Sequence, residues 1–132
     1  MTDHSTNLTR IASADGPAAI GPYSPAIRVG DLIFCSGQMP IDPATGELVD
    51  GGVAAQTRRT LDNLVALLAA AGATTAHVAK CTVFLTDMAD FAEMNAVYAE
   101  YFGEPYPARS TVAVAGIAKG ALVEIEAIAS LA

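Results

Sequence analysis

Tryptophan is absent from this 132-residue sequence and large aromatic side chains are few, whereas alanine occurs 27 times. A chain of this length buries about two-thirds of its unfolded surface on folding, so it needs neither disulfides nor metal ions to fold as one domain. Because so many of its hydrophobic side chains are small, we expect a core in which helices pack tightly against a sheet. Residues 1–15 form a polar lead, which we expect to be the mobile part of this single domain.

Basic residues are also scarce, since seven lysines and arginines stand against fourteen acidic residues and leave a net charge of −7. A phosphate backbone would be repelled over most of such a surface, so a nucleic-acid partner is disfavoured. The one adjacent basic pair, Arg58 and Arg59, falls among polar neighbours on an expected helix. We interpret this pair as part of a solvated helix face.

Cysteine and histidine occur only twice each. Cys35 and Cys81 lie far apart within apolar strand patterns, which predicts reduced, buried thiols in a cytoplasmic protein. His4 lies in the polar lead and His77 stands alone, so no metal site is expected.

Long apolar segments and phosphate-binding loops are missing as well. The longest apolar run, residues 64–73, is far shorter than the ~20 residues that span a bilayer, so no membrane span is expected. The polar start has no apolar stretch typical of a signal peptide. No glycine-rich phosphate loop follows an expected strand, which disfavours a nucleotide cofactor.

Hydrophobic periodicity predicts five strands and two helices, each helix with one apolar stripe. This pattern favours an α+β fold in which both helices pack on one face of a sheet. The other face would be semi-polar, and a second copy of the chain is its simplest cover. The expected strands are 26–29, 32–36, 78–85, 110–115 and 122–129, with turns at Gly30-Asp31 and 42–46, and the expected helices are 53–71, ended by Gly72, and one from Asp90 that Gly103 stops.

The two helices also have expected faces and caps. Asp90 and Glu93 have the spacing of a capping box at the start of the second helix. Its apolar side is expected to comprise Phe91, Met94, Tyr98, Tyr101 and Phe102. In the first helix the apolar stripe would comprise Leu61, Leu64, Val65 and Leu68, with Arg58, Arg59, Asp62 and Asn63 on the other side.

Arg109 opens an expected strand after Pro107 and Ala108, where a stiff lead-in would hold its guanidinium group at the rim of the sheet. The planar guanidinium fork suits a carboxylate ligand, although a structural ion pair with Glu124 or Glu126 is the open alternative. Glu124 and Glu126 alternate with apolar residues, so both point to one face roughly 7 Å apart. If that face is partly desolvated, repulsion raises the pKa of at least one carboxyl group and creates a candidate general base. Otherwise, this is a solvated strand face.

The distance between Arg109 and Glu124 depends on how the last two strands are connected. If they form a hairpin that turns tightly around Gly116, Arg109 falls opposite Glu124. If the loop extends to Gly120, the two residues separate by about four residues, or ~13 Å, and would converge on a ligand between them or across a subunit boundary.

Several motifs together resemble one known family, the reactive intermediate deaminases, called RidA or YjgF-like. The strongest is Pro107-Ala108-Arg109-Ser110, followed by Val112, Gly116 and the closing segment 123–126. The resemblance covers nearly the whole chain. It also includes Gly21-Pro22-Tyr23-Ser24, Ser36-Gly37-Gln38, the turn at 42–46, Gln56 to Asn63, Thr82-Val83-Phe84 and Asn95-Ala96-Val97-Tyr98.

The resemblance implies a chorismate-mutase-like α+β fold, assembled as a homotrimer with three sites in clefts between subunits. It also implies hydrolysis of 2-imino acids and their enamine precursors to 2-keto acids and ammonia, as in a 2-iminobutanoate/2-iminopropanoate deaminase. Neither a cofactor nor a metal ion takes part in that reaction. The small ligand would therefore be a 2-imino or 2-keto acid.

Carried over by motif, Arg109 would bind the substrate carboxylate and Glu124 would orient or deprotonate the attacking water. Glu126 would then be a structural partner. Four further residues would shape the pocket, with Tyr23 from the neighbouring subunit: Tyr23, Ser36, Gly37 and Asn95. Thr111 departs from the family, which frequently has cysteine there, but its backbone contact to the ligand would survive.

Two other functions fit the same residues. One is a non-catalytic trimer that binds small carboxylates in a regulatory role, since a fold does not determine a function. The other is hydrolysis of an amide or carbamate in the same pocket. Ribonuclease activity, which is sometimes attributed to the family, is opposed by the acidic composition.

Overall fold

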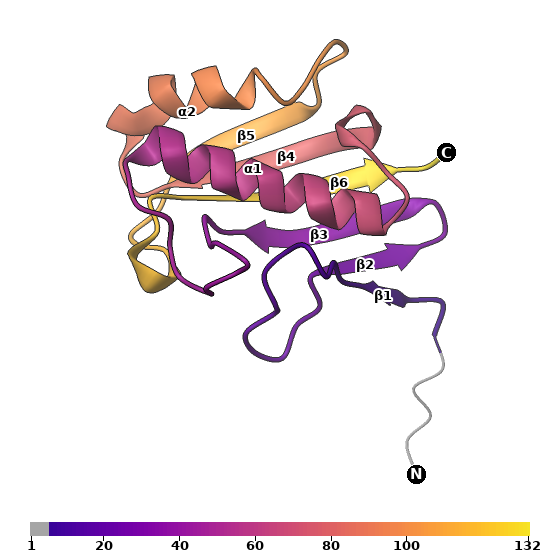
Figure 1. Cartoon of the computed structure of the whole chain (residues 1–132). Helices are drawn as coiled ribbons and strands as arrows, with labels where there is room; N and C mark the ends of the chain where they lie inside the picture. Colours follow the sequence, from indigo (N-terminus) through magenta and orange to yellow (C-terminus); the bar gives the residue numbers. More distant parts are fainter. Residues whose placement is uncertain (1–5) are drawn as a thin grey trace.

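The computed structural model describes residues 6–132, which form a six-stranded sheet and two helices. The strands lie in the order β1-β2-β3-β6-β4-β5, and all neighbours are antiparallel except β4 and β5. Figure 1 shows both helices on one face of the sheet, which confirms the predicted α+β fold. The elements are β1 (Thr9–Ile11), β2 (Ala26–Val29), β3 (Leu32–Gln38), α1 (Val53–Ala70), η1 (Thr75–His77), β4 (Val78–Leu85), η2 (Met88–Asp90), α2 (Phe91–Tyr98), β5 (Ala108–Ala113), η3 (Ala118–Gly120) and β6 (Val123–Ser130).

The predicted turns are confirmed in the first half of the chain. Strands β2 and β3 pair as a hairpin, and Gly30 has a φ of 58°, which glycine adopts without strain. At the second turn, the amide groups of Thr45 and Gly46 donate to the carbonyl oxygen of Asp42 at 3.2 and 2.8 Å. Helix α1 ends just before Gly72, as expected.

Strand β1 was not predicted. It lies within the segment assigned to the polar lead, and pairs with β2 through Arg10 and Ile27. The polar lead was expected to be mobile over residues 1–15. Residues 1–5 of that segment lie outside the described residues.

The last two strands are not neighbours, so the hairpin considered for them is wrong. Strand β6 lies between β3 and β4, and β5 pairs in parallel with β4 at the edge of the sheet. A parallel pair needs a crossover connection, and α2 supplies it between β4 and β5. As a result Arg109 stands beside Cys81 and Glu124 beside Phe84, at two different levels of β4.

The predicted capping box of α2 is also wrong. The side chain of Asp90 makes no capping hydrogen bond, whereas Asp87 accepts one from the backbone of Ala89 and begins the preceding turn η2. Helix α2 ends at Tyr98 instead of continuing toward Gly103. The chain continues in a turn that still buries Phe102, whose ring lies 4.5 Å from that of Tyr98.

The buried face of α1 differs from the predicted one at two positions. Val65 is 40% exposed, whereas Asn63 is 1% exposed. The amide group of Asn63 donates to the carbonyl oxygens of Met39 and Ile41 at 3.0 and 2.9 Å, which satisfies it in the core. Arg59 donates two hydrogen bonds to the Asn63 side-chain oxygen, so this basic residue has a structural role.

Arg58 does lie on a solvated face, as predicted. It forms a two-bonded ion pair with Glu100, with distances of 3.3 and 2.9 Å. The pair connects the exposed side of α1 to the end of α2. An exposed pair of this kind contributes little to the free energy of unfolding.

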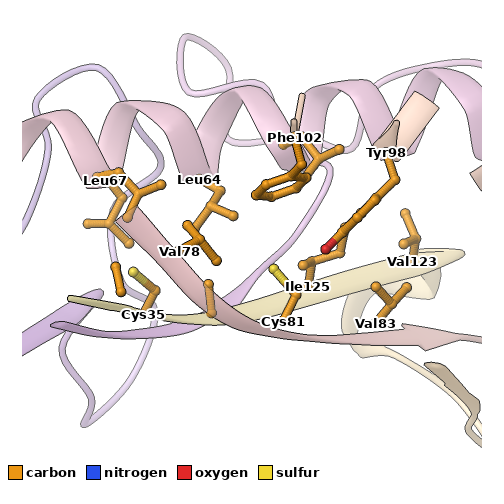
Figure 2. Close-up of a cluster of buried hydrophobic side chains, with 14 of the residues drawn as sticks. Cys35, Leu64, Leu67, Val78, Cys81, Val83, Tyr98, Phe102, Val123 and Ile125 are labelled. Carbon is orange, nitrogen blue, oxygen red and sulfur yellow. The ribbon is translucent and has the colours of Figure 1, made fainter. Parts of the chain in front are cut away.

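The core lies between α1, α2 and one face of the sheet, as Figure 2 shows for a cluster of its side chains. Cys35 and Cys81 are buried and free, as predicted. Both stand beside Ala127, one on each side of β6. Burial raises the pKa of the Cys35 thiol to about 12, so it stays protonated at neutral pH.

The face of the sheet opposite the helices is uncovered within the described part of the chain. Leu32, Phe34 and Val112 are each more than 40% exposed on it or at its edge. Exposed apolar side chains in such number are typical of a surface that another molecule covers. Neither helix of the described chain is both long and apolar enough to cross a bilayer.

Candidate functional site

The site residues predicted from the sequence fall into two groups on different strands. Glu124 lies on β6 and faces an irregularity of β3, where the pairing register shifts between Cys35 and Gln38. Ser36 and Gly37 therefore stand opposite the single residue Glu126. This is the geometry of a β-bulge, which often redirects side chains beside active sites.

Because Gly37 has no side chain, the Glu124 side chain can occupy the space beside it. A Cβ atom at position 37 would lie 2.7 Å from the carboxyl carbon of Glu124 and 2.9 Å from one of its oxygens. Real Cβ atoms do not approach other atoms so closely. Glycine at this position therefore allows the carboxylate to lie directly against the β3 backbone.

Ser36 holds the segment before β2 close to Glu124 and Gly37, and Tyr23 belongs to this segment. The Ser36 hydroxyl donates to the carbonyl oxygen of Ser24 at 2.7 Å, and its amide donates to Pro25 at 2.9 Å. Tyr23 is 49% exposed, and its hydroxyl oxygen accepts a bond from the Ile20 amide at 3.3 Å. The Ser36 hydroxyl thus donates its hydrogen bond within the protein, whereas Tyr23 is about half exposed and faces a pocket.

A cavity of about 560 Å³ joins these residues into one candidate pocket, here called the glutamate pocket. Its apolar wall includes Ile20, Met39 and Ile41. Helix α1 positions two of these residues, because the buried Asn63 amide holds their carbonyl oxygens. The polar lining comprises Tyr23, Ser36, Gly37, Gln38, Lys119, Glu124 and Glu126.

Glu124 has the electrostatics expected of a general base. It is partly buried, and burial is the main cause that raises the pKa of its carboxyl group above the ordinary value. The neighbouring charge of Glu126 raises the pKa further. No side chain within residues 6–132 forms an ion pair with either carboxylate. The raised pKa makes the Glu124 carboxylate a stronger proton acceptor once it is ionised.

Arg109 belongs to a second cavity of about 430 Å³, here called the arginine pocket, lined by Asn95, Tyr98, Ala99, Tyr106, Pro107 and Arg109. Its guanidinium carbon lies 4.7 Å from the ring centre of Tyr98 and 5.6 Å from that of Phe91. Across the described residues, Arg109 forms no ion pair, so the alternative of a structural pair with Glu124 or Glu126 is wrong. A cation held on aromatic rings keeps its N–H groups available for a carboxylate ligand.

The two pockets lie on opposite faces of the sheet. Arg109 stands beside Cys81, which points into the core below the helices, and its guanidinium group rests on α2. Glu124 alternates with the fully buried Val123 and Ile125 and therefore points to the uncovered face. One chain consequently does not bring Arg109 and Glu124 into the same cavity.

The other predicted residues divide in the same way. Tyr23, Ser36 and Gly37 line the glutamate pocket, and Asn95 lines the arginine pocket. Thr111 lines neither, although its buried hydroxyl has no hydrogen-bond partner among residues 6–132. These four residues are thus divided between two separate pockets of one chain.

Sequence reasoning missed two features of the surroundings of Arg109 and Glu124. Phe91 and Tyr98 were assigned to a core stripe, and their spacing of seven residues along α2 was the only signal that they share one side with Arg109. Lys119 was not singled out in the sequence. It lines the glutamate pocket with a φ of 61°, which is uncommon outside glycine.

Comparison with known proteins gives one consistent result. Residues 13–131 match the family model described as Endoribonuclease L-PSP. A RutC family protein of Pyrococcus horikoshii is 55% identical, with 90% of this chain and 94% of that protein aligned. The 2-iminobutanoate/2-iminopropanoate deaminase of Bos taurus is 50% identical, with 90% of this chain and 87% of that protein aligned.

Solved structures agree with the sequence matches. RidA from the Antarctic bacterium Psychrobacter sp. is 43% identical, with a TM-score of 0.90 over 93% of this chain and 99% of that one. TdcF of E. coli with bound serine is 42% identical, with a TM-score of 0.89 over 94% of this chain and 99% of that one. The similarity thus extends over almost the whole fold, including both pockets.

Proposed function

The chain belongs to the Endoribonuclease L-PSP family, which is the family of RidA and YjgF proteins, and from this we propose that it hydrolyses 2-imino acids and their enamine precursors to 2-keto acids and ammonia. The observation that carries the proposal is Arg109, a cation that lines a cavity and has no carboxylate partner among residues 6–132. The bovine relative that bears the deaminase name supports this choice of reaction. Cleavage of RNA is not proposed, because a net charge of −7 repels its backbone.

In the proposed mechanism Arg109 binds the substrate carboxylate through two parallel hydrogen bonds. Glu124 accepts a proton from a water molecule as the water oxygen bonds to the C=N carbon. Glu124 passes this proton to the nitrogen, which gives an amino alcohol. A proton then moves from the hydroxyl group to the nitrogen as the C–N bond breaks, which releases ammonia and leaves the keto group. An iminium carbon is a strong electrophile, so one base and correct positioning suffice without a covalent nucleophile.

The remaining residues would shape the pocket around this reaction. Tyr23, Gly37 and Asn95 would contact the substrate, Ser36 would hold the segment that carries Tyr23, and the Thr111 backbone would contact the ligand. The apolar wall of Ile20, Met39 and Ile41 suits a short aliphatic side chain such as that of 2-iminobutanoate. No cofactor is assigned a role.

The complete site would be formed by two chains of a cytoplasmic homotrimer. The arginine pocket of one copy would face the glutamate pocket of the next, which would bring Arg109 and Glu124 to one ligand. The exposed apolar side chains Leu32, Phe34 and Val112 support this assembly, since another copy would remove them from water.

An imine-trapping assay tests the reaction itself. A pyridoxal-phosphate threonine dehydratase converts threonine to an imine, and semicarbazide captures the imine that water has not hydrolysed. We expect the wild-type protein to speed formation of 2-oxobutanoate and to reduce the captured product. Heat-denatured protein is the control. If native protein leaves both rates unchanged but binds 2-oxobutanoate, the non-catalytic carboxylate-binding function replaces the proposed one.

Replacing Gly37 with alanine is expected to lower kcat by about 10- to 100-fold, because a displaced catalytic group has effects of this size. The new Cβ would collide with the flexible end of Glu124, which can rotate away. We therefore expect the free energy of unfolding to change by less than about 1 kcal/mol, as measured by urea denaturation.

Gly103→Ala is the matched control for this variant, because nothing lies within 4 Å of a Cβ at that position. It should keep both activity and stability. A wild-type kcat in Gly37→Ala would contradict a role for the Glu124 position in the reaction.

A further inference from the structure

The guanidinium group of Arg109 rests on two aromatic rings that no part of the proposed mechanism uses. Its carbon lies 4.7 Å from the Tyr98 ring centre and 5.6 Å from the Phe91 ring centre, both within the range of cation–π attraction. Both rings come from α2, where a spacing of seven residues places them two turns apart on one side. Within residues 6–132, Arg109 forms no ion pair beside these contacts.

The Tyr98 ring is rigidly placed. Only 5% of the residue is exposed, and its ring lies 4.5 Å from that of Phe102. Figure 2 shows its hydroxyl in the core beside Cys81, pointing away from the helices. Burial raises the pKa of the Tyr98 phenol well above its ordinary value, so the ring beneath Arg109 stays neutral.

The Phe91 ring lies at the first residue of α2 and is 37% exposed. The preceding turn η2, which the side chain of Asp87 caps, determines where the helix begins. A change of side chain at this exposed position leaves the core intact. Phe91 is therefore the position where the contact with Arg109 can be varied with the least effect on folding.

An aromatic ring and a carboxylate differ in which groups of a bound arginine remain available to a ligand. An ion pair would occupy the N–H groups of Arg109 and neutralise its charge. Stacking on a ring restricts the flexible side chain but leaves its in-plane donors and its charge available. A site with a restricted side chain loses less conformational entropy when the ligand binds.

We propose that Phe91 and Tyr98 are positioning residues, which hold the Arg109 guanidinium group in the orientation that receives the substrate carboxylate. This inference rests on the proposed function, because it assigns a carboxylate to Arg109. It predicts an effect on ligand binding that is separate from the chemical step. The two rings act only through Arg109 and do not touch the reacting C=N bond.

Substitutions that remove each ring are expected to raise KM and leave kcat within about two-fold. For Phe91→Leu we expect an increase in KM of about 2- to 5-fold, and for Tyr98→Leu of about 10-fold or more, since cation–π attraction is stronger at a desolvated site. Phe91→Tyr and Tyr98→Phe keep the rings and should restore a KM near that of the wild type. Thermal unfolding of all four variants reports whether they are folded.

The affinity for 2-oxobutanoate, measured by calorimetry, gives a second readout that needs no turnover. It should weaken in parallel with the rise in KM. If wild-type protein binds 2-oxobutanoate but does not hydrolyse imines, and Phe91→Leu binds it more weakly, the positioning role stands while the proposed reaction fails.

Two results would overturn the positioning role. One is a folded Phe91→Leu protein with wild-type KM and wild-type affinity for 2-oxobutanoate. The other is a loss of kcat and of unfolding temperature that is as large in Phe91→Tyr and Tyr98→Phe as in the two leucine variants. The rings would then only stabilise the fold.

Discussion

Arg109→Ala is expected to lower kcat/KM for 2-iminobutanoate by at least about 100-fold, because it removes a charged, two-bonded contact to the substrate carboxylate. The imine-trapping assay measures this loss. Alanine also leaves the Phe91 and Tyr98 rings without the cation that they support. Binding of 2-oxobutanoate should be lost together with activity, since the same contact would hold the product.

The free energy of unfolding should fall by about 2 kcal/mol at most in Arg109→Ala, because the contacts with Phe91 and Tyr98 are lost but no carboxylate of the described chain loses a partner. Arg109→Lys is the matched control, since it keeps the charge but not the planar fork. We expect it to recover only part of the activity. An Arg109→Ala protein with wild-type kcat/KM would exclude the carboxylate contact and the proposed reaction geometry with it.

The individual elements of the fold could be predicted because their signals are local. The period-two pattern placed β4 at its observed bounds, and glycine marked the hairpin after β2 and the end of α1. The order of the strands could not be predicted in this way. The parallel pairing of β5 with β4 depends on α2 crossing back over the sheet, and alternation within a strand carries no information about its neighbour.

The charged groups of the candidate site could be named from the sequence, but their arrangement could not. The motif around Arg109 and the pair Glu124 and Glu126 identified the charged groups, and burial together with repulsion raises the pKa of Glu124 as expected. The sequence distance between Arg109 and Glu124 suggested either a direct pair or a shared ligand. Their positions on opposite faces follow from the register of both strands on β4, because Arg109 pairs with Cys81 and Glu124 pairs with Phe84, three residues further along.

Buried polar residues of α1 show a second limit of periodicity. Asn63 was placed on the solvated side because its side chain is polar, yet it lies in the core. Its position becomes favourable only when the carbonyl oxygens of Met39 and Ile41 are brought to it by a distant loop. The hydrophobic periodicity of a helix does not indicate hydrogen bonds to segments more than twenty residues away.

Mixing two inactive variants is expected to restore activity, because the proposed site takes Arg109 from one chain and Glu124 from another. Glu124→Gln removes the base but keeps the shape of the side chain, and Arg109→Ala removes the carboxylate contact. When the two variants assemble at random in equal amounts, about one site in four receives an intact residue from each partner. Coexpressed chains should then show about a quarter of the wild-type kcat per site, whereas each variant alone stays near zero.

The controls for this experiment separate assembly from chemistry. Each variant coexpressed with itself must stay inactive, and size-exclusion chromatography must show that the mixed protein has the same oligomeric state as the wild type. A site formed within one chain would give no recovery, since every chain in the mixture lacks one of the two groups. Recovery of activity therefore tests whether at least two copies bring Arg109 and Glu124, which lie on opposite faces of the sheet in one chain, to one substrate.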